Sequence, residues 1–231
     1  MAEYKFDPKF DWWEKDHYEN HKWLERYFLD QYEGSPLHFL EIGVFEGRTM
    51  IWAVETILRQ VVEKGSSYVG VDPEPAANFE GNFEILKTKV PTVDAKFIKA
   101  YSEHFLPKIA GTPRYDFVYI DGDHNAQGVL RDGVFAWECL KVGGVALFDD
   151  YEMEATDPWH YISHKEFKEH ERAKFRHPSI AIDAFLNVYR GLYDRVIDNF
   201  QVGIIKRVEL GGKNIRHGDD TQGTFEYHAK K

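Results

Sequence analysis

The chain has 231 residues, a formal net charge of −10 and a hydrophobic share of 43%. These values exclude a disordered chain, and the acidic balance argues against a nucleic-acid backbone as the main partner. The single cysteine, Cys139, excludes an intrachain disulfide and predicts a cytoplasmic protein. The sequence contains no run of about 18 apolar residues, so no membrane-spanning helix is predicted.

The first 35 residues are unusually aromatic and predict a helical segment that ends at Gly34-Ser35-Pro36. The simplest interpretation is a helix packed over the edge of a sheet. The alternative is a lid over a substrate or a contact between subunits, which leaves a homo-oligomer open. The aromatic residues are Phe10, Trp12, Trp13, Tyr18, Trp23, Tyr27, Phe28 and Tyr32.

Between residues 37 and 150, apolar strands alternate with helices expected at 49–64, 79–89 and 126–140. This alternation predicts an α/β fold with a mostly parallel sheet and right-handed crossovers. Four of the strands end in a carboxylate or lead directly into one. These acids are Glu41, Asp72, Asp121 and the pair Asp149-Asp150.

The first strand turns through Glu41-Ile42-Gly43-Val44-Phe45-Glu46-Gly47 into a helix. A strand, a glycine turn and a helix are typical of the first unit of a nucleotide-binding domain. Gly43 and Gly47 let the backbone approach a ligand closely, and the start of the helix presents unpaired N–H groups.

Residues after 150 change character. Charged and histidine residues dominate 151–177, and an amphipathic helix is expected from Pro178 to Tyr189. Two strands follow at 193–199 and 201–208, and their short connection predicts an antiparallel pair. The predicted organisation is a helical extension at 1–35, one domain at 36–210 with an insertion at 151–177, and a polar tail at 211–231.

Carboxylates also suggest a metal site. If the strands that end at Asp121 and Asp149-Asp150 are neighbours, three acids lie close together, because adjacent strands are about 4.8 Å apart. Such a cluster needs a proton or a cation, and oxygen ligands suit Mg²⁺ or Mn²⁺. The alternative is that Asp149 caps the strand and Asp150 is solvated.

Several segments together resemble the class I S-adenosylmethionine-dependent methyltransferases, and within them the metal-dependent sugar O-methyltransferases of the macrocin and novobiocin type (methyltransferase family 24). The resemblance covers about residues 37 to 205 and implies a Rossmann-like, seven-stranded sheet whose last strand is antiparallel. Phe45 departs from many methyltransferases, which have a glycine there. The matching segments are Glu41 to Thr49, Val69 to Pro73, Lys99 to Glu103, Tyr119 to His124 and Leu140 to Tyr151.

The resemblance implies S-adenosylmethionine as the cofactor. We expect Asp72 to accept hydrogen bonds from the ribose hydroxyls, and Glu41 to hold the glycine loop or the amino end of the cofactor. Tyr101 and Ser102 resemble the turn that contacts adenine, although Ser102 would also serve as an ordinary helix N-cap. The expected cofactor-binding residues are Glu41, Gly43, Phe45, Gly47, Thr49, Asp72, Tyr101, Ser102 and Asp121.

Methyl transfer to a hydroxyl requires help with deprotonation. The resemblance implies that Asp121, Asp149 and Asp150 hold Mg²⁺ or Mn²⁺, which lowers the pKa of the acceptor oxygen. Asp123 is the expected base, and His124 orients it, contacts the substrate or is purely structural. The acceptor is expected to be a sugar or glycoside, with a catechol or phenol as the alternative.

Functions of other classes stay open at this point. Tyr161 and Lys165 have the Tyr-x-x-x-Lys spacing of short-chain dehydrogenases, but the glycine loop lacks the third glycine of a dinucleotide-binding site. A non-catalytic cofactor-binding protein, or a hydroxylase-like relative on the same scaffold, would also retain the fold.

Overall fold

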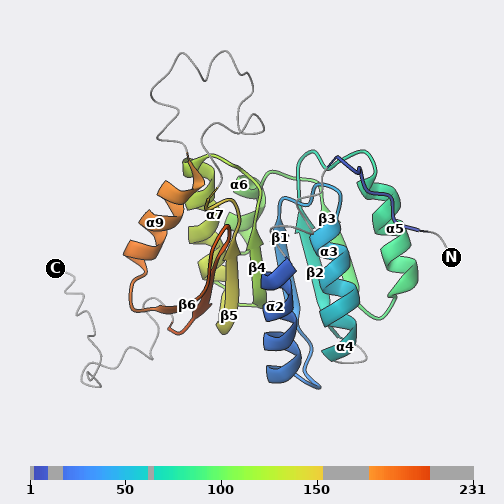
Figure 1. The fold of residues 1–231 in the computed structure, drawn as a ribbon, viewed down its shortest axis with the longest axis horizontal. Helices are drawn as coiled ribbons and strands as arrows, with labels where there is room; N and C mark the ends of the chain where they lie inside the picture. The colour runs from blue at the N-terminus through green and yellow to red at the C-terminus, as the bar shows by residue number, and fades with distance from the viewer. Residues whose placement is uncertain (1–2, 10–17, 62–64, 153–176, 209–231) are drawn as a thin grey trace, which may run out of the picture.

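The computed structural model describes residues 3–9, 18–61, 65–152 and 177–208. They form one seven-stranded sheet in the order β3-β2-β1-β4-β5-β7-β6 (Figure 1). β1 to β5 pair in parallel, and β7 is antiparallel to both β5 and β6. The mostly parallel α/β fold and its antiparallel last strand are therefore confirmed. The strands are β1 (His38–Ile42), β2 (Ser67–Val71), β3 (Asp94–Ile98), β4 (Tyr115–Ile120), β5 (Leu140–Phe148), β6 (Tyr193–Asp198) and β7 (Val202–Lys206).

Helices cover both faces of this sheet and bury its central strands from two sides (Figure 1). All six residues of β4 are buried, as a central parallel strand requires. The helices are α2 (Tyr18–Gln31), α3 (Arg48–Ala53), α4 (Arg59–Val61), α5 (Phe79–Lys89), α6 (Ser102–Phe105), α7 (Ala126–Cys139) and α9 (Pro178–Val188), with a π-helical turn (Val54–Leu58) between α3 and α4 and a 3₁₀ turn (Leu106–Lys108) after α6.

Each face of the sheet has its own apolar core. On one face α2 places Phe28 against Phe39 and Phe117, with ring centroids 4.8 and 5.9 Å apart. On the other face α7 and α9 pack together, and Phe185 lies 5.1 Å from Phe148 of β5. Phe28 of α2 is thus a core residue over the central strands β1 and β4, and Trp23 and Tyr27 pack against that core partly buried.

The order of the strands also locates the ligand edge. The chain runs outward from β1 through β2 to β3, and then returns to β4 beside β1. Ligands of open α/β sheets bind where the order reverses in this way, outside the carboxyl ends of the strands. The loops after β1 and β4 therefore border the expected crevice.

The predicted helical N-terminal segment is partly wrong. Residues 3–9, here called the N-terminal strap, have no helical turns and lie against α3 and α5, whereas α2 begins only at Tyr18. Aromatic composition alone could not separate the strap from the helix. Pro8 and the two polar residues beside it interrupt any helical repeat in the strap.

The other predicted boundaries agree closely with the structure. The helix expected at 49–64 is the run from α3 through the π turn to α4. Most of the 151–177 insertion, with Tyr161 and Lys165, and the 211–231 tail lie outside the described residues. Among the described helices, none has the length and apolar character needed to cross a membrane.

Candidate active site

The glycine loop after β1 has a backbone that few residues adopt. Gly43 and Gly47 have φ of 85° and 81°, and Phe45 between them has φ of 48°. A Cβ at Gly43 would lie 1.9 Å from the carbonyl oxygen of Asp121, so only glycine fits there. The loop is therefore pressed against the end of β4, where the acidic residues begin.

Asp72, at the end of β2, faces this loop. Its Oδ2 accepts the N–H groups of Val44 and Phe45 at 2.9 and 3.1 Å, and its Oδ1 accepts from Glu74. The carboxylate thus fixes the strained part of the loop. Its predicted contact with a ribose stays a prediction.

Glu41 lies beneath the loop and is fully buried. Burial raises the pKa of its carboxyl well above the usual range, although hydrogen bonds from Tyr68 and Thr49 oppose that rise. Tyr68 donates its hydroxyl to Oε2 at 3.0 Å. Thr49 is buried in the first turn of α3, so Glu41 is bonded to the helix that follows the loop. That Glu41 holds the loop or the amino end of the cofactor stays a prediction.

Tyr101 and Ser102 begin α6, on the same edge of the sheet. The Tyr101 ring is 54% exposed and meets His104 edge-on, so a flat ligand could reach it. The Ser102 hydroxyl lies close enough to the buried Asp132 carboxylate to lower its pKa. Their contact with adenine stays a prediction.

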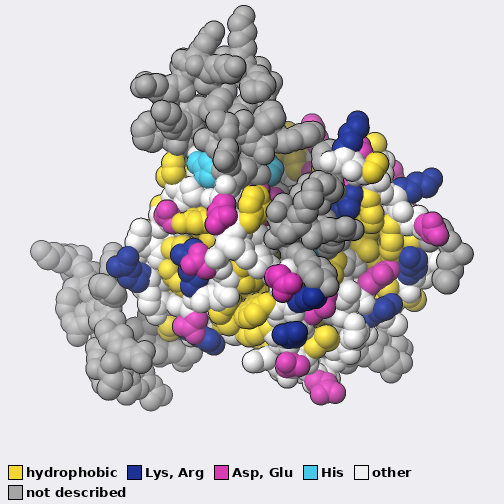
Figure 2. All heavy atoms as spheres, in the orientation of Figure 1, with side chains coloured by type: hydrophobic (Ala, Val, Ile, Leu, Met, Phe, Trp, Pro, Cys, Tyr) yellow, Lys and Arg dark blue, Asp and Glu magenta, His cyan; other side chains and the backbone are white. Residues whose placement is uncertain are grey.

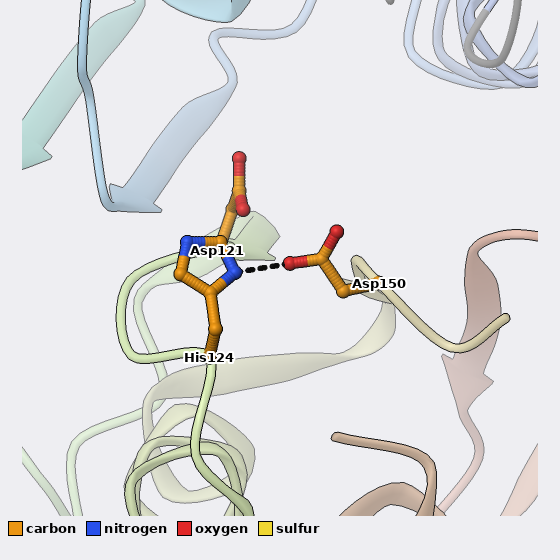
Figure 3. Close-up of side chains that lie close together, drawn as sticks. All are labelled: Asp121, His124 and Asp150. Atoms are coloured by element: carbon orange, nitrogen blue, oxygen red, sulfur yellow. Dashed lines mark hydrogen bonds and ion pairs between the residues drawn. The ribbon is translucent and has the colours of Figure 1, made fainter. Parts of the chain in front are cut away.

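An acidic group lies at the ends of β4 and β5. Asp121 follows β4, His124 stands before α7, and Asp150 follows β5, and one ligand atom of each lies within 4.8 Å of the others (Figure 3). His124 Nδ1 and Asp150 Oδ2 form a hydrogen bond. Asp150 itself has φ of 61°, a left-handed conformation that Asp tolerates better than most residues.

The electrostatics of this group are those of crowded acids. Burial raises the pKa of Asp121 well above its usual range, and the charges of Asp149 and Asp150 raise it further. Burial lowers the pKa of His124, but the hydrogen bond and charge of Asp150 outweigh it, so the pKa lies above 6.5. A positive group between these carboxylates is therefore favourable.

Two predicted residues have other surroundings. Asp149 accepts hydrogen bonds from the Tyr119 hydroxyl, from Gln201 at 3.2 Å and from the Asp150 N–H at 2.9 Å. Asp123 accepts from the backbone and side chain of Asn125 at 3.0 and 2.8 Å, and its Oδ2 fills the space beside Gly128. Asp149 therefore supports Asp150 through the hydrogen bond from the Asp150 N–H. Asp123 lies just before the start of α7.

Sequence reasoning missed the residues that support the site. Tyr119 and Gln201 hold Asp149, and the buried Glu46 ties the loop to the N-terminal strap. The signal for Gln201 was a polar residue next to the apolar strand β7. The signal for Glu46 was its position as an acid within the glycine loop, which the fold buries.

Comparisons with known proteins agree with this geometry. The family described as a methyltransferase domain (methyltransferase family 24) matches residues 40–151, from β1 to the end of β5. The uncharacterized protein R132 of Acanthamoeba polyphaga mimivirus is 30% identical over 132 residues, which are 55% of this chain and 57% of the viral protein. The chain thus matches little more than half the length of that relative.

Two solved structures share the fold. The O-methyltransferase TomG of Streptomyces achromogenes, in complex with SAM, has a TM-score of 0.53 at 15% identity, covering 89% of this chain and 92% of TomG. An O-methyltransferase of Bacillus cereus, in complex with SAH, has a TM-score of 0.52 at 14% identity, covering 89% of this chain and 84% of its own. Residues 40–151 thus match a methyltransferase family, and the chain shares its fold with these two O-methyltransferases.

Proposed function

We propose that this methyltransferase acts on a hydroxyl group of a small molecule, with a sugar or glycoside as the acceptor class and a catechol or phenol as the alternative. The acidic group of Asp121, His124 and Asp150 beside the glycine loop is the observation that carries the proposal. TomG and the Bacillus cereus protein, which share the fold, are O-methyltransferases, which supports an oxygen acceptor.

Residues of the loop edge would bind the methyl donor. Residues 43–47 bring backbone N–H groups to the crevice without a side chain at Gly43 or Gly47. Asp72 would accept the ribose hydroxyls, and Tyr101 offers an exposed ring for adenine. When bound, S-adenosylmethionine supplies an electrophilic methyl group to this edge.

The donor atoms of the acidic group fit a divalent cation. Asp121 and Asp150 offer carboxylate oxygens, which suit Mg²⁺ or Mn²⁺, and His124 lies beside them. A bound cation would supply the positive charge that lowers the pKa of a nearby hydroxyl. Asp149 would then act behind Asp150 as an orienting residue, because its oxygens already accept hydrogen bonds from protein groups.

Proton acceptance falls to His124 on this geometry. Asp150 holds the Nδ1 side of the ring, as a carboxylate orients a catalytic imidazole, and the other nitrogen is the one that could take a proton. Asp123 is placed at the start of α7 by Asn125. It therefore serves as the comparison residue in tests of the base.

The charge of the chain supports a small-molecule partner. The net charge is −10, and the face shown in Figure 2 mixes acidic and basic side chains with apolar ones among the described residues. A nucleic-acid-binding face would instead gather Lys and Arg along one band.

A labelled methyl transfer assay tests the proposal. The protein is incubated with S-adenosylmethionine carrying a deuterated methyl group, with Mn²⁺ or Mg²⁺, and with a panel of glycosides, catechols and amines. Mass spectrometry should find the label on a hydroxyl compound, with turnover falling at least about 100-fold in His124→Gln and less in Asp123→Asn. Label on amines alone would contradict the oxygen acceptor.

A further inference from the structure

The N-terminal strap is fastened to the glycine loop by a buried carboxylate. Glu46 is 1% exposed, and its Oε1 accepts the N–H of Asp7 at 2.7 Å and the side chain of Asn78 at 2.6 Å. Its Oε2 accepts from Arg48 at 2.9 Å. Losing a hydrogen-bond partner is costly for a buried carboxylate, so the Asp7 N–H of the strap helps to hold Glu46 in place.

Further contacts lock the strap along the same side of the loop. Asn82 on α5 exchanges two hydrogen bonds with Lys5, at 2.8 and 2.9 Å, and donates to the carbonyl of Glu46 at 3.1 Å. The Arg48 guanidinium lies 4.4 Å from the centre of the Phe6 ring and donates to the Asp7 carbonyl at 3.2 Å. The strap thus contacts the residues on both sides of Gly47.

This fastening bears on the conformation that the loop needs. Phe45 has φ of 48°, a left-handed conformation that is strained for a non-glycine residue and persists only when its surroundings determine it. Asp72 holds the N–H of Phe45 on one side. Glu46 is the next residue in the chain, and the Asp7 N–H of the strap bonds its carboxylate.

We propose that the N-terminal strap belongs to the donor-binding site: through Glu46 and Arg48 it holds residues 43–47 in the conformation that binds S-adenosylmethionine. Glu46 and Phe6 are then positioning residues for the donor. The inference rests on the proposed function, since it takes the glycine loop as the donor site. It makes donor affinity depend on a segment outside the domain matched at residues 40–151.

Calorimetric titration with S-adenosylhomocysteine tests this inference on the full chain. Phe6→Ala removes the ring over Arg48 and leaves Glu46 intact. If the loop then adopts the binding conformation about one tenth of the time, the Kd rises about tenfold. Phe6→Tyr keeps the ring and should bind as the parent protein does.

Tyr4→Phe is the matched control within the strap. Tyr4 bonds Glu55 and lies under Lys89, away from the loop, so its change should leave the Kd within about twofold. Because Phe6→Ala removes a ring and Tyr4→Phe only a hydroxyl, urea unfolding of both variants confirms that each is folded at the temperature of the titration. Equal Kd values for the parent and Phe6→Ala would overturn the inference.

Hydrogen–deuterium exchange without ligand provides the second readout. The N–H groups of Val44 and Phe45 donate hydrogen bonds to Asp72. They should exchange faster in Phe6→Ala than in Tyr4→Phe. Unchanged exchange would also overturn the inference. If the parent does not bind S-adenosylhomocysteine, the proposed function fails, and faster exchange would then show only that strap and loop are coupled.

Discussion

Asp149 and Asp150 are neighbours in the chain, yet they have different surroundings. Both follow the end of β5, and the backbone turns left-handed at Asp150, with φ of 61°. Asp150 joins Asp121 and His124, whereas Asp149 bonds Tyr119 and Gln201. The sequence predicted that acids gather at these strand ends. Which of the two acids joins Asp121 and His124 depends on the backbone conformation at Asp150, which the sequence does not show.

Metal binding should distinguish these acids. Asp150→Asn removes a carboxylate of the acidic group and should weaken Mn²⁺ binding by more than about 100-fold, beyond the usual cost of losing an orienting partner. Asp149→Asn should cost about 10–100-fold, because it removes only the support of Asp150. Electron paramagnetic resonance of free Mn²⁺ in a titration measures both values.

Asp123→Asn is the control for that titration. Asp123 lies close in sequence and carries the same charge, but it bonds Asn125 at the start of α7. Its change should leave Mn²⁺ affinity within about threefold. Losses as large as those of Asp150→Asn would mean that Asp123 is a ligand and that the proposed group is wrong.

Gly43 offers a residue-scale test of the loop. Gly43→Ala places a Cβ 1.9 Å from the Asp121 carbonyl oxygen at φ of 85°, whereas Gly191→Ala has nothing within 4 Å at φ of 84°. The control should therefore lose only the backbone cost of about 1–2 kcal/mol. Overpacking adds about 1–3 kcal/mol at Gly43.

Urea unfolding of the two variants measures this difference. Gly43→Ala should be the less stable, or fail to fold. Equal losses of unfolding free energy would mean that the loop does not press against the end of β4.

At the scale of elements, the apolar strands of the sheet were predictable because they are long and uninterrupted. The N-terminal strap was not, because its contacts are polar and join residues far apart in the sequence. Lys5 bonds Asn82, and Asp7 bonds Glu46. Local pattern carries no information about such pairs, so the sequence predicts a helix where the structure has the strap.

Helix α7 contains a buried acid that makes stability depend on pH. Asp132 is fully buried, and burial raises its pKa from 3.8 to about 6, although Ser102 and Arg131 oppose the rise. Because the fold favours the proton, the stabilisation is complete below the unfolded pKa and is lost as the pH rises through about 6.

Asp132→Asn should therefore stabilise the protein at high pH. The asparagine stays neutral, so the variant should exceed the parent at pH 8 by up to about 3 kcal/mol and by much less near pH 4.5. Urea unfolding at both pH values checks the prediction, and a gain that is the same at both would contradict it.

At the scale of the whole molecule, the strand order brings three parts of the candidate site to one edge of the sheet. The loop after β1, the acid after β2 and the acidic group after β4 and β5 all lie at the carboxyl ends of parallel strands. Alternation of strands and helices was enough to predict this edge. It could not identify the acceptor, because the alternation determines the fold and not the side chains that recognise a substrate.

Ligand binding by the intact chain tests the central claim, that this edge binds the methyl donor. Calorimetry should show one S-adenosylhomocysteine per chain, no binding of NADH, and a loss of about 2–4 kcal/mol in Asp72→Ala, which removes two charge-assisted ribose bonds and frees two loop N–H groups. Tight NADH binding without S-adenosylhomocysteine binding, or full affinity in Asp72→Ala, would contradict the account.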